Sequence, residues 1–281
     1  MTMHFREVTR ADRDRVIALR ELCFPGLDPE KSDPRFWEWQ HIRSRAFVGE
    51  EDGQLLTHLL MLEWQGNVLG IEAMTSPAAR GRGAFTGVMR HMLDNRGDAV
   101  AIAFQIRAAV AGTLVRTGWG LAARVPVLVR PVPLLKRKRA VFRTLTRDDA
   151  RWMSNIARNE RDLTWRLFDC PVWQYRVTSI ENEAYLAARK TTLKGFDTYA
   201  IVDLAFRDKR AAKALLRDAL AEAKEQRCRL VAALVSRDHP AFWLLVRSGF
   251  LPAPYHFRFL THPPEHAKRR WPLMWADTDH L

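Results

Sequence analysis

Apolar residues recur along the first half of the chain with two periods, one typical of helices and one typical of strands. Residues 9–22 carry apolar side chains at helical spacing, and Thr9 stands where a helix N-cap is expected. The pattern predicts strands at 46–50, 54–64, 68–75, 99–105 and 121–130, and helices at 9–22, 85–95 and 109–116, with a short aromatic helix at RFWEWQ. This succession predicts an α/β fold in which helices flank a mostly antiparallel mixed sheet.

The second half of the chain repeats three stretches of the first half in the same order. FREVTRAD returns as FRTLTRDD, GAFTGVMRHML returns as RAAKALLRDAL, and LVRTGW returns as LVRSGF. Thr9 and Thr146 both precede acidic residues, as helix N-caps do. We interpret these repeats as a tandem duplication; the alternative is a chance resemblance of short stretches.

The two repeats predict two domains, at residues 1–135 and 140–281. Between them, the stretch PVPLLKRKRA interrupts both periodicities with two prolines and a basic run at 136–139. This run could bind nucleic acid, but a solvated linker is the favoured interpretation.

Composition narrows the choice of partners and compartment. The chain has 281 residues and a formal net charge of +13, with 47% hydrophobic residues, which is enough for an ordinary core. The positive charge favours anionic partners such as nucleic acid, acidic membranes or phosphorylated small molecules. The three cysteines, Cys23, Cys170 and Cys228, have no zinc spacing and suit a reducing compartment. With no signal-peptide pattern at the start and no apolar run of about 20 residues, we expect a soluble, cytoplasmic protein.

The stretch AARGRGAFTG lies between a predicted strand and a predicted helix. The first N–H groups of a helix have no partner within the helix, and glycine lets the backbone approach a ligand closely. A phosphate or diphosphate is the natural ligand of such a turn, and Arg80 and Arg82 add positive charge. The sequence lacks the Gly-Lys-Ser/Thr of a Walker loop and the third glycine of a dinucleotide-binding loop.

The longer stretch GIEAMTSPAARGRGAFTGVMRHML resembles the acetyl-CoA-binding segment of the GNAT superfamily of N-acetyltransferases. Pro77, Arg80 and Gly83 match that segment, whereas Phe85 stands where a small residue is usual. The later LVRTGW resembles the segment that closes the cofactor site in these enzymes, so the resemblance covers most of residues 1–135.

The resemblance implies two tandem GNAT-like domains and direct transfer of an acetyl group from acetyl-CoA to an amine. It assigns the backbone of Ala73 and Thr75 to the pantetheine arm. It assigns the diphosphate to Arg80, Gly81, Arg82, Gly83, Ala84 and Phe85. A metal ion is not expected, although Asp277, Asp279 and His280 lie close together near the C-terminus.

The group that handles the proton is harder to assign from the sequence. Leu114 and Leu245 occupy the position where many family members have a catalytic tyrosine, so that role is not carried over. Glu72 is the candidate general base, because it is a lone carboxylate in an apolar strand; the alternative is that it faces solvent. His58 could serve instead, although a core histidine is the favoured interpretation, and water could replace any side chain.

Two further predictions concern the acceptor and the second half. Trp37 and Trp39 could line an acceptor pocket, although core packing is favoured. In the second half, the glycine loop becomes Arg207-Asp208-Lys209-Arg210, which has lost both glycines and gained a carboxylate. We therefore expect one CoA site per chain, in the first half.

Three functions remain open at this point. The favoured one is an N-acetyltransferase acting on a small-molecule amine, with an unknown acceptor and oligomeric state. The second is a CoA-binding or scaffolding protein without catalysis, which the missing tyrosines would suit. The third is an aminoacyl-tRNA-dependent transferase, which the positive charge would suit; nucleic acid is not expected but is not excluded.

Overall fold

The structure is a computed structural model that describes residues 3–132 and 142–278. The chain forms two compact units, and neither is one continuous stretch of sequence. The N-terminal unit consists of Met1–Ala122, Cys170–Val172 and Leu260–Ala267, and the C-terminal unit of Ala123–Asp169, Trp173–Phe259 and Lys268–Leu281. The basic run at 136–139 lies outside the described residues, so the domain limits of 135 and 140 stay a prediction.

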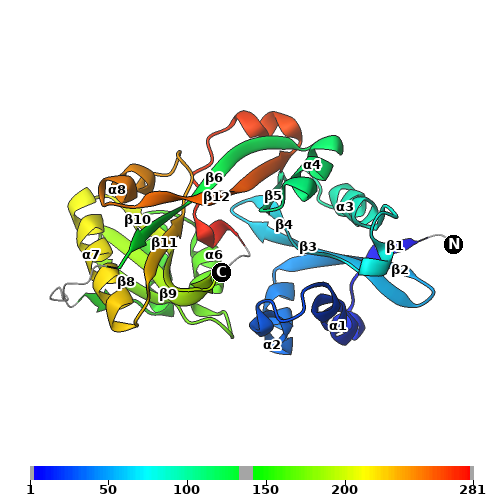
Figure 1. The fold of residues 1–281 in the computed structure, drawn as a ribbon, viewed down its shortest axis with the longest axis horizontal. Helices are drawn as coiled ribbons and strands as arrows, with labels where there is room; N and C mark the ends of the chain where they lie inside the picture. The colour runs from blue at the N-terminus through cyan, green and yellow to red at the C-terminus, as the bar shows by residue number, and fades with distance from the viewer. Residues whose placement is uncertain (1–2, 133–141, 279–281) are drawn as a thin grey trace. The chain divides into compact units, whose positions relative to one another are not determined.

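In the N-terminal unit, strands β1 to β5 form a sheet in chain order (Figure 1). Neighbouring strands are antiparallel, except that β4 and β5 are parallel and are connected through α3. The elements of this unit are β1 (His4–Glu7), α1 (Arg13–Cys23), α2 (Pro34–His41), β2 (Ser44–Glu51), β3 (Gln54–Trp64), β4 (Asn67–Thr75), α3 (Ala84–Asp94), β5 (Ala101–Gln105) and α4 (Ala108–Arg116).

Helices cover both faces of this sheet, with α1 and α2 on one face and α3 on the other (Figure 1). Successive residues of β2 show the alternation that produces these two layers. Phe47 packs in a cluster with Val88 and Met92 of α3, whereas its neighbour Val48 packs with Val16 of α1 and Trp37 of α2. The predicted fold class, a mostly antiparallel mixed sheet flanked by helices, is confirmed.

The helix predicted at 9–22 begins with a short 3-10 turn, η1 (Arg10–Asp12), that leads into α1. Thr9 caps this turn: its N–H and its hydroxyl each donate to Asp12 Oδ2 at 3.0 Å. Arg6 donates two hydrogen bonds to the same carboxylate and is the main reason that the pKa of Asp12 lies well below its usual value. The predicted cap at Thr9 is therefore confirmed.

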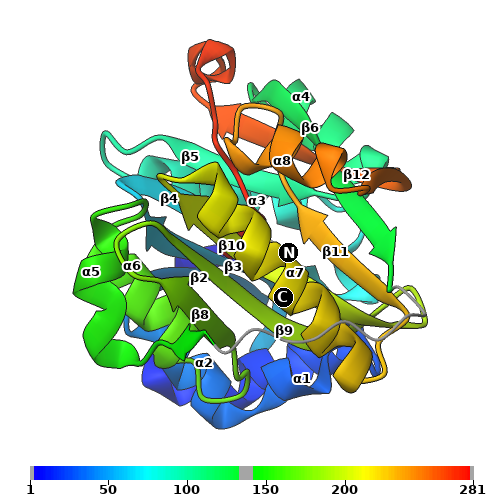
Figure 2. The same ribbon diagram turned by 90° about the vertical axis from the view of Figure 1, so that its left-hand side faces the viewer.

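In the C-terminal unit, the strand order is β12-β6-β11-β10-β9-β8-β7. The first three residues of β6 and the last three of β12 belong to the N-terminal unit. Helix α7 lies across β8, β9 and β10, as Figure 2 shows, and its apolar face packs against Leu186 and Tyr199 of that sheet. The elements are β6 (Gly120–Pro131), β7 (Arg143–Thr144), α5 (Ala150–Ser154), α6 (Glu160–Leu163), a π-helical turn (Thr164–Phe168), β8 (Arg176–Ile180), β9 (Ala184–Leu193), β10 (Phe196–Phe206), α7 (Lys209–Glu225), β11 (Leu230–Leu234), α8 (Ala241–Arg247) and β12 (Leu251–His262).

The two units share local features at the sites of the sequence repeats. Thr146 caps a 3-10 turn through Asp149, as Thr9 does through Asp12, and Arg143 pairs with Asp149 as Arg6 pairs with Asp12. Strands β10 and β11 are parallel and are connected through α7, just as β4 and β5 are connected through α3. These parallels favour a duplication, which remains a prediction.

Candidate functional site

The parallel pairing between β4 and β5 ends well before β4 does. The ladder joins Val68 to Ala101 and ends with the pair of Gly70 and Ala103, while β4 continues to Thr75. Past Gly70, β4 therefore has an edge that no described strand pairs with, directly before the glycine loop. An extended ligand can form backbone hydrogen bonds along such an edge.

A β-bulge distorts β4 at this point. Leu60 of β3 pairs with Ile71, but His58 pairs with Met74, so β4 contains one extra residue. Glu72 adopts the left-handed conformation there, with φ of 48°, which is uncommon for a residue other than glycine. Ala73 packs on the α3 side of the sheet, whereas the Glu72 side chain contacts α1 on the other side.

The Glu72 carboxylate is buried between two cations. Its side chain is only 8% exposed, with Arg20 Nε at 3.5 Å from Oε2 and Lys31 Nζ at 3.2 Å from Oε1. Arg20 belongs to α1 and Lys31 to the 3-10 turn η2 (Pro29–Ser32), so these ion pairs fasten both segments to the bulge. The alternative of a solvent-facing Glu72 is wrong, although its role as a general base stays a prediction.

Sequence reasoning did not select Arg20 or Lys31. Arg20 follows Val16 by four residues and therefore shares the apolar face of α1, where a cation needs a partner. That position was the available signal. Lys31 gave no comparable signal, because the turn that buries it has no periodic pattern.

His58 lies beside Glu72 on the α1 and α2 side of the sheet. It is 1% exposed, and its Nδ1 is 2.9 Å from the carbonyl oxygen of Glu72. Burial lowers the pKa of this histidine. The favoured interpretation of a core histidine fits its burial, yet its ring holds the backbone of the bulge.

The glycine loop has the conformation that the sequence analysis required. Gly81 and Gly83 have φ values of 77° and 81°, and a Cβ added at either would meet open space. Helix α3 begins at Ala84, and its N-cap Gly83 offers no side chain to its free N–H groups. Among the described residues, no hydrogen bond is made by the backbone N–H groups of Gly81, Gly83, Ala84, Phe85 and Thr86.

The charged and aromatic side chains of the loop differ in their availability. Arg82 forms an ion pair with Glu51 at 2.6 Å, whereas the exposed Arg80 has no ion pair within residues 3–132 and 142–278. The Phe85 side chain packs against the apolar cluster under α3. The unusual residue at this position therefore leaves the loop backbone uncovered.

The other candidate residues occupy the core or the surface. Leu114 and Leu245 are both fully buried in apolar clusters. Trp37 and Trp39 are buried as well, in agreement with the favoured interpretation of core packing. Asp279 and His280 lie outside the described residues, and no metal-binding group of three or more His, Cys, Asp or Glu side chains occurs in the part that the structure describes.

The corresponding position in the C-terminal unit is closed at the helix. Asp208 is the N-cap of α7, and its carboxylate accepts the N–H of Ala211 at 2.9 Å. The hydrogen bonds from Ala211 and Arg210 lower the pKa of this aspartate. An anion at the start of α7 would therefore meet a carboxylate that already uses the helix N-terminus.

The C-terminal segment fills the neighbouring gap between strands. The parallel ladder of β10 and β11 ends at the pair of Ile201 and Ala233. Beyond it, Met274 pairs with Val235, and the N–H of Ser236 donates to the carbonyl of Leu273 at 2.9 Å. In the C-terminal unit, the segment after Trp271 thus fills the position equivalent to the open strand edge of the N-terminal unit.

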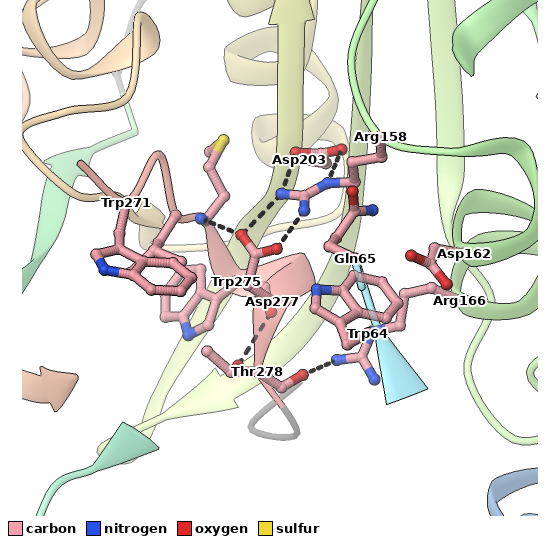
Figure 3. A network of polar contacts seen from close by, with 12 residues as sticks. Trp64, Gln65, Arg158, Asp162, Arg166, Asp203, Trp271, Trp275, Asp277 and Thr278 are labelled. Carbon is pink, nitrogen blue, oxygen red and sulfur yellow. Dashed lines mark hydrogen bonds and ion pairs between the residues drawn. The ribbon is translucent and has the colours of Figure 1, made fainter. Parts of the chain in front are cut away.

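A buried polar network holds this segment in place (Figure 3). Arg158 donates to Asp203 at 3.0 Å and also to Asp277, and the hydroxyl of Tyr185 donates to Asp203 at 2.8 Å. Asp203 follows a bulge in β10, and Asp277 belongs to the 3-10 turn η7 (Trp275–Asp277). Burial opposes ionisation of Asp203, but Arg158 and Tyr185 outweigh it and hold its pKa below the usual value.

The N-terminal unit therefore has an open strand edge that leads through a bulge into a glycine loop with unpaired N–H groups. A family model described as an acetyltransferase (GNAT) domain matches residues 4–122. The chain carries a GNAT domain. The GNAT match and the fold support an acyltransferase, and they cover the whole candidate site.

Solved structures extend the likeness in fold beyond the GNAT domain. A GCN5-related N-acetyltransferase from Kribbella flavida is 14% identical, with a TM-score of 0.65, and the match covers 95% of this chain and 73% of that chain. One from Anabaena variabilis is 13% identical, with a TM-score of 0.64, and the match covers 92% and 72%. Saccharomyces cerevisiae N-myristoyltransferase with bound myristoyl-CoA is 12% identical, with a TM-score of 0.61, and the match covers 93% and 79%.

Two further findings are negative. None of the curated proteins matches the chain in sequence. Within the described residues, no helix combines the length and the apolar character that a membrane span requires.

Proposed function

We propose that this protein is an N-acetyltransferase that transfers an acetyl group from acetyl-CoA to the amine of a small molecule. The observation that best supports this proposal is the contrast between the starts of two helices in the same chain. The start of α3 has open glycines and unpaired N–H groups, whereas the start of α7 is occupied by Asp208. We also propose that the C-terminal unit is a second GNAT-like copy that lost its CoA site.

The proposed binding mode uses the backbone of the N-terminal unit. The five unpaired N–H groups of the loop and of the start of α3 would hold the diphosphate, and Arg80 would add a positive charge without breaking an existing ion pair. The free edge of β4 at Ala73 and Thr75 would hold the pantetheine arm. This arrangement would bring the thioester close to the bulge at Glu72.

Acyl transfer requires the acceptor amine to lose a proton and the thiolate to gain one. Two neighbouring groups at the bulge are candidates for accepting the amine proton, the carboxylate of Glu72 and the ring of His58. Glu72 is the candidate from the sequence, and its two cationic neighbours are the structural argument against it. The length of the acyl group and the identity of the acceptor stay open.

The first test is calorimetric titration with acetyl-CoA. In a Gly83→Asp variant, the new carboxylate would face the diphosphate, and we expect binding to weaken by roughly 3 kcal/mol or more. Gly195→Asp is the matched control, because Gly195 also has a positive φ, of 80°, and open space at its Cβ, but lies in the β9–β10 turn. Unchanged affinity in a folded Gly83→Asp protein would contradict the proposed site.

The alternatives predict different results in the same experiments. An aminoacyl-tRNA-dependent transferase should bind tRNA and not acetyl-CoA. A CoA-binding or scaffolding protein should bind acetyl-CoA but release no free thiol with any amine. A screen of acceptor amines that monitors free thiol therefore separates catalysis from binding. We propose a cytoplasmic location on the sequence evidence alone.

A further inference from the structure

Three buried ring nitrogens on the α1 and α2 side of the sheet lack hydrogen-bond partners among the described residues. They are His58 Nε2 on β3 and both His41 Nε2 and Trp37 Nε1 on α2, and none has a partner among the described residues. Buried polar atoms in proteins are rarely left unpaired. We therefore expect a group outside the described residues to pair with these three atoms.

The three side chains belong to one cluster. Val48 and Met74 are the cross-strand neighbours of His58, and both pack against Trp37. The rings of Trp37 and His41 are stacked with their centroids 3.7 Å apart, and His41 interacts electrostatically with His58. The unpaired atoms therefore lie in the same buried region between α2 and the sheet.

The hydrogen-bond partners fix the proton positions on both rings. His41 Nδ1 lies 2.7 Å from the carbonyl oxygen of Trp37, and His58 Nδ1 lies 2.9 Å from that of Glu72. A carbonyl oxygen only accepts, so each Nδ1 carries the hydrogen. Burial lowers the pKa of both histidines, to about 4 for His41, so both rings are neutral near pH 7. Both Nε2 atoms consequently offer lone pairs, whereas Trp37 Nε1 offers an N–H.

One donor and two acceptors match the hydrogen-bonding capacity of a water molecule. We propose that His58, His41 and Trp37 hold a buried water molecule, and that this water passes the proton of the acceptor amine to His58 Nε2. The second part rests on the proposed function, whereas the first part does not. The bulge links the two parts, because the carbonyl that orients His58 belongs to Glu72, where β4 leaves β5.

The proposed step balances without another reactant. The amine nitrogen forms a bond to the acyl carbon, and the carbon–sulfur bond breaks to release the thiolate. The proton from nitrogen moves through the water to His58 Nε2, and one proton returns to the thiolate. The Glu72 carboxylate is the charged group that interacts with the His58 ring, and it is itself paired with Arg20 and Lys31. His41 is the titratable neighbour on α2, and it stays neutral.

The tautomers can be tested without any activity. Nitrogen-15 NMR of the histidines in the wild-type protein at pH 7 should show both His58 and His41 as neutral rings with hydrogen on Nδ1. A Trp37→Phe variant should change the Nε2 shifts of both, because it removes the donor that orients the water. Hydrogen on Nε2 of His58, or an imidazolium at pH 7, would overturn the proposed water site.

The relay is tested by kinetics on His58→Gln, which can keep the bond to the Glu72 carbonyl but cannot take up a proton. We expect kcat to fall by roughly 100-fold and its acidic limb to flatten, with acetyl-CoA affinity unchanged. His91→Gln, in α3, is the control and should keep wild-type kinetics. Wild-type kcat and pH dependence in a folded His58→Gln enzyme would overturn the relay. Wild-type protein that binds no acetyl-CoA would overturn the proposed function and the relay with it, and the water site would be judged by NMR alone.

Discussion

At the scale of single residues, the carboxylate of Glu72 has two possible roles, one in packing and one in proton transfer. A carboxylate between two buried cations stabilises the packing of α1 and η2 on the bulge, whatever its part in the chemistry. Removing one member of such a group leaves the others with uncompensated charge, while removing a charge of each sign restores the balance. This property allows stability and catalysis to be separated.

We predict that Glu72→Gln lowers the free energy of unfolding by about 3–5 kcal/mol, because Arg20 and Lys31 lose their anion. Glu72→Gln combined with Lys31→Met should recover part of that loss in urea denaturation. Turnover should stay low in both variants, because the proposed His58 imidazolium has lost its anionic neighbour.

The pH dependence of kcat in the Glu72→Gln variant separates the two candidate bases. If Glu72 orients and stabilises His58, the acidic limb of the profile should remain. A flattened limb would make Glu72 the proton acceptor, as the sequence analysis predicted, and would count against the water relay. Wild-type turnover would exclude both roles for Glu72.

At the scale of elements, the sequence predicted most of the N-terminal unit and part of the site. The long apolar run of β3 and the cap at Thr9 are local signals, so the strand at 54–64 and the start of α1 followed directly. The bulge at Glu72 depends on the register between β3 and β4, which a single strand's pattern cannot encode. The unpaired N–H groups of α3 were expected, because glycine at 81 and 83 is a local signal as well.

The buried polar network of the C-terminal unit also depends on contacts that the sequence pattern does not reveal. Arg158, Asp203 and Asp277 are far apart in sequence, and Asp277 was noticed only as a candidate metal ligand. Their meeting depends on tertiary folding, which pairs Met274 with Val235. No spacing rule could have predicted that contact.

We predict that the C-terminal unit loses stability in acid through Asp203. The pKa of Asp203 is lower in the folded protein than its ordinary value of 3.8, so the unfolded chain binds more protons in that range. Its contribution is therefore complete above about pH 5 and is lost as the pH falls through its folded pKa. Asp203→Asn should cost about 3–5 kcal/mol at pH 7 and should show a smaller further loss between pH 5 and 3.

Urea denaturation across pH 3 to 7 measures this effect. Asp197→Asn is the control, because Asp197 lies on the same strand but is half exposed, 3.6 Å from Lys190. It should have stability within about 0.5 kcal/mol of wild type. Equal behaviour of the two variants would show that the Arg158 network does not stabilise the unit.

At the scale of the whole molecule, the two units have matching topology and opposite accessibility. The N-terminal unit has an open strand edge and a free helix start, while the C-terminal unit fills both with its own residues. If the chain arose by duplication, the second copy kept its sheet and replaced the ligand with a carboxylate and a chain segment. The net charge of +13 is not by itself evidence for a second CoA site.

We predict that acetyl-CoA binds with a stoichiometry of one per chain. Arg207→Ala and Arg210→Ala should leave both the stoichiometry and the affinity unchanged, because these residues flank the capped start of α7. Isothermal titration calorimetry measures both quantities, and Arg80→Ala is the contrasting variant, in which affinity should fall. Two molecules bound per chain would show that the C-terminal unit retains a site.

The discontinuous make-up of the N-terminal unit bears on how the protein forms during synthesis. Leu260 belongs to the apolar cluster beneath α3, and Gly120 leaves room for Pro264, whose carbonyl oxygen would lie 2.7 Å from an added Cβ. A nascent chain of which only residues 1–122 have emerged from the ribosome lacks these contacts. The proposed catalytic unit, although most of it precedes the C-terminal unit in the sequence, can therefore complete its core only after residues 260–267 have been synthesised.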